Sequence, residues 1–308
     1  MRLCAVSVDL DEIPNYYQIH GLPIPKRAET AVYDLALPRL FDFAALQQIP
    51  LTLFVIGKDL TRTEAVERLR AARALGHEIG NHSLDHLYDL TRRSRAEIER
   101  QVRIASERIE HATGFTPTGF RAPGYTTNDT LYSVLTDAGV RYSSSVFPSP
   151  AYYAAKSAAI GLYRVLGRRS HSVVDTPYVL GAPRNPYRVG KPYWTPGDGL
   201  WEFPIQVTQH LRLPYIGTTL TLAGPERARW LTRGVIGAPF VNLELHGIDV
   251  LDTSDGLQDL APHQRDVRVK LARKLATLSG VIEQLREAGY RFVRLDEVAG
   301  AWEESVSD

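Results

Sequence analysis

The sequence is poor in sulfur and has no long apolar segment. Its single cysteine, Cys4, lies inside an apolar run, so a disulfide framework is excluded and the thiol is expected to pack as a small hydrophobe. No stretch approaches the roughly 18 apolar residues of a membrane-spanning helix. Carboxylates follow the first short apolar run directly, which is unlike a signal peptide. We therefore expect a cytoplasmic protein.

The chain also lacks an excess of either charge. It has 36 basic and 35 acidic residues and a net charge of +1, which gives no reason to expect a nucleic-acid partner. Its 308 residues and 44% hydrophobic content suit one α/β barrel with a full core.

Short apolar runs alternate with segments of helical periodicity along most of the chain. Strands are expected at 3–8, 51–57, 77–80, 119–121, 140–143, 201–205, 240–245 and 291–295. Helices are expected at 29–48, 63–75, 94–113, 128–138 and 263–288, and a loop at 12–27. Seven or eight strand–helix units favour a parallel barrel over an open sheet. We expect one domain over residues 1–308.

Residues 147–200 break this alternation. They are rich in Pro, Gly, Tyr and Arg, with one helical stretch at 151–166, and are interpreted as an insertion or cap within the domain. The segment 152–169 is apolar and aromatic and ends in basic residues, so it is a candidate for peripheral contact with the inner membrane face. The alternative is a helix that packs against the barrel.

Polar side chains recur where the expected strands end. They are Asp9, Asp11, His82, His86, Arg121 and His246. In a parallel barrel the carboxyl ends of the strands meet at one face, where active sites lie. Residues far apart in the sequence are therefore expected to meet in one site.

Asp11, His82 and His86 are candidate metal ligands. A carboxylate with two imidazoles leaves a coordination position open for water, and the spacing of the histidines puts both rings on one face if the segment turns helical. Such a set suits Zn²⁺, while Co²⁺, Ni²⁺, Mn²⁺ or Fe²⁺ also fit. The sequence therefore predicts one divalent metal ion.

The remaining residues are candidates for acid–base chemistry. Asp9, on the same side of an extended strand as Asp11, can act as general base, and Arg121 can pair with it. His246 can protonate a leaving amine. A backbone N–H at Gly124 or Tyr125 can stabilise an oxyanion.

Each feature alone has an ordinary explanation. A lone Asp-x-Asp is often solvated, a lone arginine often forms a surface ion pair, and a histidine at a strand end is often simply hydrogen-bonded. Their conjunction at successive strand ends favours the catalytic interpretation.

The ordered motifs resemble the polysaccharide deacetylase superfamily (NodB homology, carbohydrate esterase family 4). They are Ser7-Val8-Asp9-Leu10-Asp11, His82-Ser83-Leu84-Asp85-His86, Arg121-Ala122-Pro123-Gly124 and Leu243-Glu244-Leu245-His246. The resemblance implies a distorted (β/α) barrel of about seven strands and a metal-dependent hydrolase that deacylates amino sugars. It implies the same roles for Asp9, the metal ligands, Arg121 and His246.

The chain departs from the family pattern at two places. Leu10 separates aspartates that are adjacent in the best-known members. The element that tunes the acid histidine is not evident, and the candidates for it are Asp198, Trp201, Glu202 and Asp249.

Three functions remain open. The first is an N-deacetylase or N-deformylase of an amino sugar, with a cytoplasmic glycan precursor or lipid-linked sugar as substrate. The second is an allantoinase-like amidohydrolase of a small non-sugar amide. The third is an inactive metal-binding scaffold, against which the presence of both a base and an acid argues.

Overall fold

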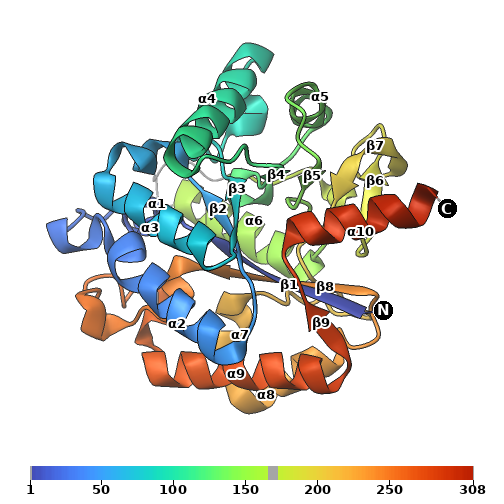
Figure 1. Cartoon of the computed structure of the whole chain (residues 1–308). Coiled ribbons are helices and arrows are strands. Elements are labelled where there is room, and N and C mark those ends of the chain that lie inside the picture. Colours follow the sequence, from blue (N-terminus) through green and yellow to red (C-terminus); the bar gives the residue numbers. More distant parts are fainter. Residues whose placement is uncertain (1, 166–172, 308) are drawn as a thin grey trace.

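The structure, a computed structural model, describes residues 2–165 and 173–307 (Figure 1). The strands in these residues are β1 Arg2–Asp9, β2 Thr52–Val55, β3 Glu78–Asn81, β4 Gly119–Phe120, β5 Tyr142–Ser143, β6 Tyr187–Val189, β7 Pro196–Glu202, β8 Phe240–His246 and β9 Tyr290–Phe292. The α-helices are α1 Pro14–His20, α2 Leu37–Gln47, α3 Thr63–Ala74, α4 Arg95–Thr113, α5 Asp129–Asp137, α6 Pro150–Val165, α7 Gly217–Ala223, α8 Pro225–Arg233, α9 Leu271–Glu287 and α10 Leu295–Ser307.

The strands form one curled sheet in the order β6-β7-β5-β4-β3-β2-β1-β8, and β9 also pairs with β1. Among these strands every pairing is parallel except that of β6 with β7. Seven successive parallel strands therefore run from β7 to β8, with helices outside them (Figure 1). The predicted distorted (β/α) barrel is confirmed.

Strand β1 pairs with three other strands of the sheet. Its residues from Leu3 to Asp9 are all buried, as expected for an apolar strand of a parallel sheet. It pairs with β8 along most of its length on one edge. On the other edge it pairs first with β9 and then, from Ser7 onward, with β2.

The barrel is distorted between β8 and the segment after β7. Pro204 has no N–H and cannot continue a strand ladder. The side chain of Asn242 in β8 instead donates to the carbonyls of Phe203 and Pro204, both at 3.2 Å. The backbone N–H of Asn242 donates to Gln206 Oε1 at 3.1 Å. Side-chain hydrogen bonds thus connect the two sides where the ladder is interrupted.

The loop expected at 12–27 contains the short helix α1. Ile13 and Tyr17 are four residues apart and both fully buried, and Gly21 ends the helix with a left-handed φ of 65°. The spacing was present in the sequence but was obscured by the surrounding prolines and glycine.

Two other boundaries differ from expectation. Helix α9 begins at Leu271 rather than at residue 263, because the side chain of Asp252 accepts the N–H of Leu271 (2.7 Å) and so caps a helix start there. Strand β7 begins at Pro196 and shares only residues 201 and 202 with the expected strand at 201–205, since Pro204 limits the strand on its C-terminal side. Helices α7, α8 and α10 and strand β6 were not expected.

The range 147–200 holds α6, β6 and most of β7. The helix was expected at 151–166 and is found at Pro150–Val165. Residues 166–169, the basic end of the segment with candidate membrane contact, lie outside the described residues. From Tyr187 onward the range belongs to the sheet.

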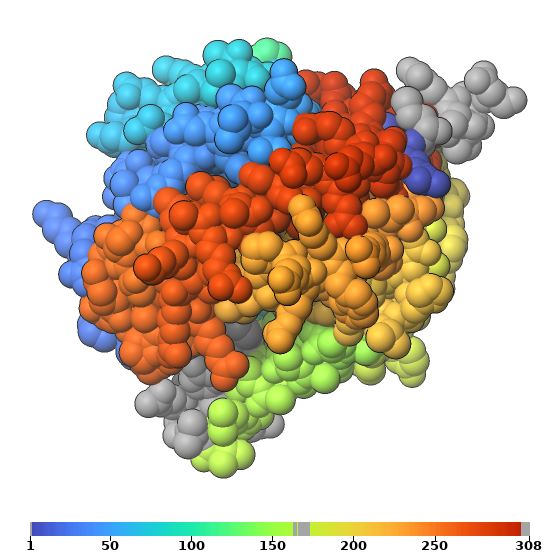
Figure 2. Space-filling view, turned by 90° about the horizontal axis from the view of Figure 1, so that it is seen from below, coloured from blue at the N-terminus to red at the C-terminus, as the bar shows by residue number. Residues whose placement is uncertain are grey.

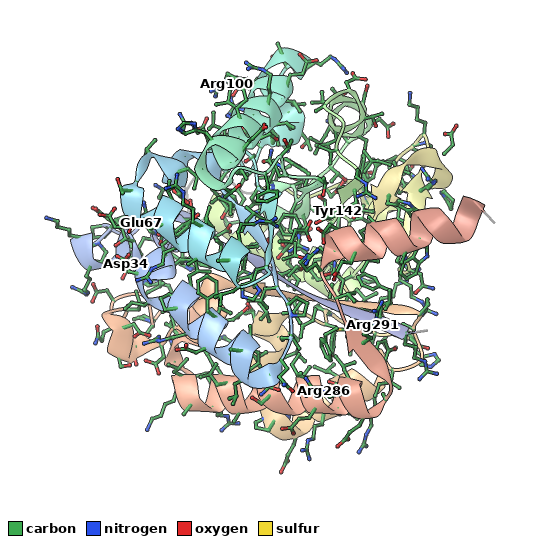
Figure 3. The ribbon with its side chains drawn as sticks, viewed as in Figure 1. Asp34, Glu67, Arg100, Tyr142, Arg286 and Arg291 are labelled. Atoms are coloured by element: carbon green, nitrogen blue, oxygen red, sulfur yellow. The ribbon has the colours of Figure 1, made fainter. Side chains whose placement is uncertain are left out.

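The outer surface is built from helices with charged faces. Figure 2 shows the face that α8 and α9 cover, with α6 at its edge. In Figure 3 the labelled side chains of Asp34, Glu67, Arg100 and Arg286 lie on these outer elements, whereas Tyr142 lies inside. Within the described residues, no helix has both the length and the apolar character needed to cross a membrane.

Gly119 in β4 is expected to be intolerant of even one methyl group. A Cβ there would lie 2.1 Å from the ring of Tyr142, whose hydroxyl is held by Glu78 at 2.6 Å. Gly119→Ala should lower stability by about 1–3 kcal/mol through overpacking. The matched control is Gly280→Ala in α9, where the nearest atom lies at 3.9 Å and a gain of about 0.5–1 kcal/mol is expected. Thermal unfolding measures both, and equal midpoints for the two variants would contradict this packing.

Candidate active site

The carboxyl ends of the parallel strands bring the predicted polar residues together. Asp9 is the last residue of β1 and His246 the last of β8, and the two are direct partners in the register of these strands. His82 follows the end of β3, and Arg121 follows the end of β4. The candidate base, the candidate acid, a candidate metal ligand and the arginine therefore all lie at the same end of the sheet.

Asp11, His82 and His86 form a compact buried cluster. Asp11 Oδ1 lies 3.2 Å from the Nε2 atom of each histidine. These three atoms have no hydrogen-bond partner in the described part of the chain, although all are buried. Burial raises the pKa of Asp11, but the neighbouring His86 and His82 outweigh it and hold that pKa well below its usual range. Buried polar atoms left unpaired in this way are costly unless a ligand completes them.

The ring of His82 is oriented by the backbone. Its Nδ1 lies 2.8 Å from the carbonyl oxygen of Arg121. A carbonyl can only accept, so Nδ1 carries the proton, and in the neutral form of the ring Nε2 is the nitrogen with the free lone pair. Metal-binding histidines are commonly fixed by such a second hydrogen bond.

The segment from His82 to His86 is not helical, contrary to the expectation for the two rings. Ser83 and His86 both have left-handed backbone conformations, with φ of 65° and 55°. Such residues cost of order 1–3 kcal/mol each, and local hydrogen bonds compensate. Asn81 Oδ1 accepts the N–H of Ser83 (2.8 Å), and Ser83 Oγ accepts the N–H of His86 (3.1 Å). Asn81 and Ser83 therefore shape the cluster without belonging to it.

Asp9 is held at one oxygen and open at the other. Arg121 Nη1 donates to Asp9 Oδ1 at 2.7 Å, and both side chains are almost fully buried. Asp9 Oδ2 faces the centre of the site, 3.7 Å from His82 Nε2 and 4.0 Å from His246 Nε2. This carboxylate is thus fixed in orientation while one oxygen stays available for a proton.

Glu244 is the partner of the His246 ring. Its Oε1 lies 2.9 Å from His246 Nδ1, and neither carboxylate oxygen has a hydrogen-bond partner elsewhere among the described residues. On the opposite side of the ring, Nε2 lies 3.3 Å from the hydroxyl of Tyr125. Glu244 precedes His246 by two residues in β8, so both side chains point to the same face of the sheet.

The surroundings of His246 favour its protonated form. Burial lowers the pKa of this imidazole, but the negative charges of Glu244 and Asp9 outweigh burial, and the pKa lies well above the usual value. A protonated ring with its Nε2 directed into the site is suited to proton donation.

The residues predicted to tune His246 have other roles. Glu202 accepts the N–H groups of Ser145 and Val146 (2.7 and 2.8 Å) and so holds the segment after β5. The Trp201 ring packs under the guanidinium of Arg188, whose Cζ lies 5.0 Å from the ring centroid. Sequence spacing did not reveal this, because it does not show that β7 lies between β6 and β5 in the sheet.

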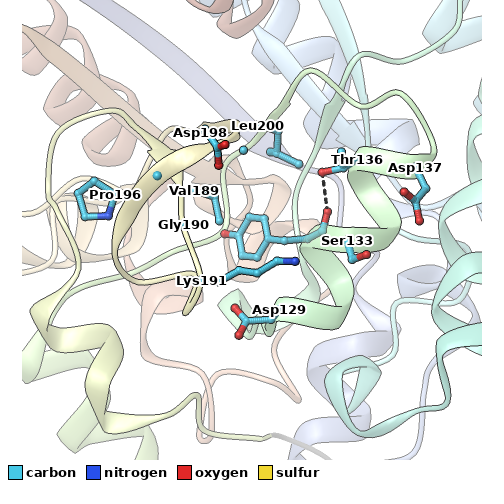
Figure 4. A pocket seen from close by; sticks show the side chains of 13 residues that line it. Asp129, Ser133, Thr136, Asp137, Val189, Gly190, Lys191, Pro196, Asp198 and Leu200 are labelled. Atoms are coloured by element: carbon cyan, nitrogen blue, oxygen red, sulfur yellow. Dashed lines mark hydrogen bonds between the residues drawn. The ribbon is translucent and has the colours of Figure 1, made fainter.

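The carboxylates of Asp198 and Asp249 do not contact the His246 imidazole either. Asp198 is exposed and lines a separate cavity of about 540 Å³ between α5 and the β6–β7 hairpin (Figure 4). Asp249 Oδ2 accepts the backbone N–H of His246 at 2.9 Å. It therefore contacts the backbone of His246, while Glu244 contacts the ring.

Gly124 and Tyr125 lie in a tight turn beside the site. Both have left-handed backbone conformations, with φ of 62° and 56°. The backbone N–H of Tyr125 was one of the two predicted oxyanion donors. It donates to the carbonyl of Ala122 at 3.1 Å and is therefore already used in the turn. The hydroxyl of Tyr125 reaches the site instead.

Glu244→Gln should lower the pKa of the His246 imidazole, because it removes the closest negative charge while burial remains. Deprotonation of the ring would then occur at lower pH than in the unaltered protein. NMR titration of the His246 ring nitrogens measures the shift. Asp249→Asn is the matched control, since the Asp249 carboxylate accepts the backbone N–H of His246 and the hydroxyl of Thr218, and burial raises its own pKa to about 6. An equal shift in both variants would remove Glu244 as the specific partner.

Comparison with known proteins agrees with this geometry. The family model described as polysaccharide deacetylase matches residues 32–143, which include His82, His86 and Arg121. Asp9, Asp11 and His246 lie outside the matched segment and join it through the fold.

Several solved structures share the fold. A putative polysaccharide deacetylase from Mycobacterium smegmatis is 17% identical, with a TM-score of 0.60 over 99% of this chain and 91% of that one. A family 4 carbohydrate esterase domain of a xylanase from a Trinervitermes trinervoides hindgut metagenome is 14% identical, with a TM-score of 0.51 over 98% and 91%. A family 4 pseudoenzyme from Bacillus anthracis is 13% identical, with a TM-score of 0.51 over 97% and 65%.

At these identities the solved structures show a shared fold and not a shared substrate. The family-model match adds the motif segment with two of the candidate ligands. Taken with the fold, it agrees with the resemblance seen in the sequence: residues 32–143 match the polysaccharide deacetylase family, and the chain shares its fold with a solved putative polysaccharide deacetylase.

Proposed function

We propose that this protein is a metal-dependent hydrolase that removes an N-acyl group, acetyl or formyl, from an amino sugar. The observation that carries the proposal is the convergence of three unpaired, buried atoms, Asp11 Oδ1, His82 Nε2 and His86 Nε2, next to a fixed carboxylate and a protonated imidazole. This combination provides what hydrolysis of an amide requires.

The donor set fits a divalent metal ion. One carboxylate and two imidazoles would hold it, and zinc is the ion that such ligands favour, while Co²⁺, Ni²⁺, Mn²⁺ and Fe²⁺ accept them too. The hydrogen bond from His82 Nδ1 to the Arg121 carbonyl leaves the correct ring nitrogen free. When bound, such an ion acidifies water and polarises a carbonyl oxygen.

Asp9 would take the proton of the attacking water. Its Oδ1 is held by Arg121, so its Oδ2 keeps one direction and faces the metal-ligand cluster. A general base of this kind typically contributes about 10²–10⁴-fold to rate. Arg121 acts as a positioning residue, since it contacts Asp9 and not the reacting atoms.

His246 would donate a proton to the leaving amine. Glu244 holds its Nδ1 and leaves Nε2 directed into the site, 4.0 Å from Asp9 Oδ2. The tetrahedral centre would thus lie between a carboxylate that accepts and an imidazolium that donates, and collapse would release the acid and the free amine. The Tyr125 hydroxyl, 3.3 Å from Nε2, can hydrogen-bond the substrate beside it.

Aromatic side chains around the site support a sugar over a small non-sugar amide. Tyr125 packs edge-on against Tyr152 and Phe147, and Tyr88 packs edge-on against His86. Sugars stack on such rings, whereas a site for a small anionic amide would bind its negative charge with arginines. The one arginine in the acid–base network, Arg121, is occupied by Asp9.

A binding-only scaffold is the second candidate, because one of the structures with this fold is described as a pseudoenzyme. A protein that only binds metal needs neither a positioned base nor a paired acid. This chain has Asp9 with Arg121 and His246 with Glu244.

Loss of both histidine ligands should abolish tight metal binding. The variant His82→Ala with His86→Ala removes two of three donors, and metal analysis of the purified protein measures the result. His77→Ala with His111→Ala is the matched control, because these histidines lie away from the cluster. Unchanged metal content in the ligand variant would refute the site.

Asp9→Asn should keep the metal and lose turnover by about 10²–10⁴-fold, because the amide cannot accept the proton of water. Acetate and formate release from N-acylated sugars, with and without chelator, measures this against the unaltered protein. Full activity in Asp9→Asn would remove Asp9 from the role of base. Metal bound by the unaltered protein without any acyl release would favour the scaffold.

A further inference from the structure

Lys156 on α6 carries a positive charge beside the site that no carboxylate pairs with. Its Nζ donates to the backbone carbonyl of Gly124 at 2.7 Å and lies 5.7 Å from the centre of the Tyr152 ring. It forms no ion pair with any residue that the structure describes. Burial lowers the pKa of this amine to about 8, so it is still mostly charged near neutral pH.

The nearest carboxylate is already occupied. Asp175 accepts the N–H of Thr127 at 3.2 Å, the N–H of Thr176 at 2.6 Å and the hydroxyl of Tyr193. Its charge acts on Lys156 only at a distance. A mostly buried ammonium with one neutral acceptor has donor capacity left over and lacks a counter-ion.

The amine lies close to the metal-ligand cluster. A Cβ on Gly124 would meet Tyr88 Cδ1 at 3.0 Å and Lys156 Nζ at 3.4 Å, so the amine and the Tyr88 ring come together over this turn. Tyr88 in turn stands edge-on to the ring of His86, with 4.8 Å between centroids. Lys156 is therefore one aromatic ring away from a candidate metal ligand.

The same helix also reaches the acid side of the site. Tyr152 is one turn before Lys156 on α6, and its ring packs edge-on against Tyr125 at 5.8 Å. The hydroxyl of Tyr125 lies 3.3 Å from His246 Nε2. Within one turn of α6, the Tyr152 ring therefore lies toward Tyr125 and His246, and the Lys156 amine lies toward Tyr88 and His86.

We propose that Lys156 binds a phosphate ester carried by the amino-sugar substrate. This rests on the proposed function and names its substrate class. Lysine binds phosphate as a point charge, and a charge-assisted hydrogen bond to an anion would supply the counter-ion that the described residues do not. A sugar phosphate, a nucleotide-linked sugar and a polyprenyl-phosphate-linked sugar share this group.

The experiment compares kcat/KM for N-acetylglucosamine with that for its 1-phosphate, its uridine diphosphate form and its polyprenyl-phosphate form. The unaltered protein should favour phosphate-bearing substrates, and the form with the highest kcat/KM identifies the source of the phosphate. Lys156→Met should reduce the preference ratio by about ten- to a hundredfold. Lys156→Arg should keep most of it. Lys191→Met, an exposed lysine at the separate cavity, is the control and should keep the ratio.

Two results would overturn the proposal. One is an unaltered protein with no preference for phosphate. The other is a Lys156→Met variant that loses neutral and phosphorylated substrates equally, which would make Lys156 a latch between α6 and the Gly124 turn. If no substrate releases acid, the proposed function fails by itself. Calorimetric binding of glucosamine 1-phosphate to the unaltered and Lys156→Met proteins then decides, and equal affinities would refute the phosphate site.

Discussion

The buried guanidinium of Arg121 is the group on which the interior of the barrel depends. It is fully buried, and a cation there costs several kcal/mol unless its donors are satisfied. It donates to Asp9, to the hydroxyl of Ser7, and to both the hydroxyl and the carbonyl of Ser144. The ring of Phe54 lies under it at 4.2 Å. Strands β1, β2 and β4 and the segment after β5 must therefore keep their register for the charge to be tolerated.

This constraint links the fold to the chemistry. A buried ion pair is weak evidence for stability, because hydrophobic residues in its place often serve as well. The arrangement makes sense as positioning: Arg121 fixes one oxygen of Asp9 and, through its own carbonyl, the tautomer of His82. One residue at the end of β4 thus orients both the candidate base and a candidate metal ligand. A lysine could neither span these partners nor present a planar fork.

Much of the site could be predicted from the sequence because strand ends in a parallel barrel converge by geometry. The metal ligands and the acid–base candidates needed only the positions of β1, β3, β4 and β8. Glu244 was missed although its signal was present, since Asn242, Glu244 and His246 alternate with apolar residues and must share a face. The other candidates, Asp198 and Glu202, are in β7, whose neighbours in the sheet are β6 and β5 and not β8.

Other features depend on tertiary contacts that no local pattern encodes. The left-handed conformations of Ser83 and His86 exist because Asn81 is itself held, its amide donating to the carbonyl of Val102 in α4 at 2.9 Å. A helical spacing rule applied to residues 82–86 alone cannot include that support. Likewise, nothing near Lys156 in the sequence indicates that its amine meets a turn at Gly124.

The catalytic candidates and the proposed recognition residues lie on different kinds of element. Asp9, His246 and Glu244 are in β1 and β8, which pair with each other over seven residues, and this suits groups that must hold a geometry within fractions of an ångström. Tyr152 and Lys156 are on α6, which follows the short strand β5 and lies beyond the segment that the family model matches. A helix attached at the rim can change its side chains without disturbing the buried charges beneath it. Divergence of substrate within one chemistry is therefore expected to be concentrated in this helix and in the turn at Gly124 that it contacts.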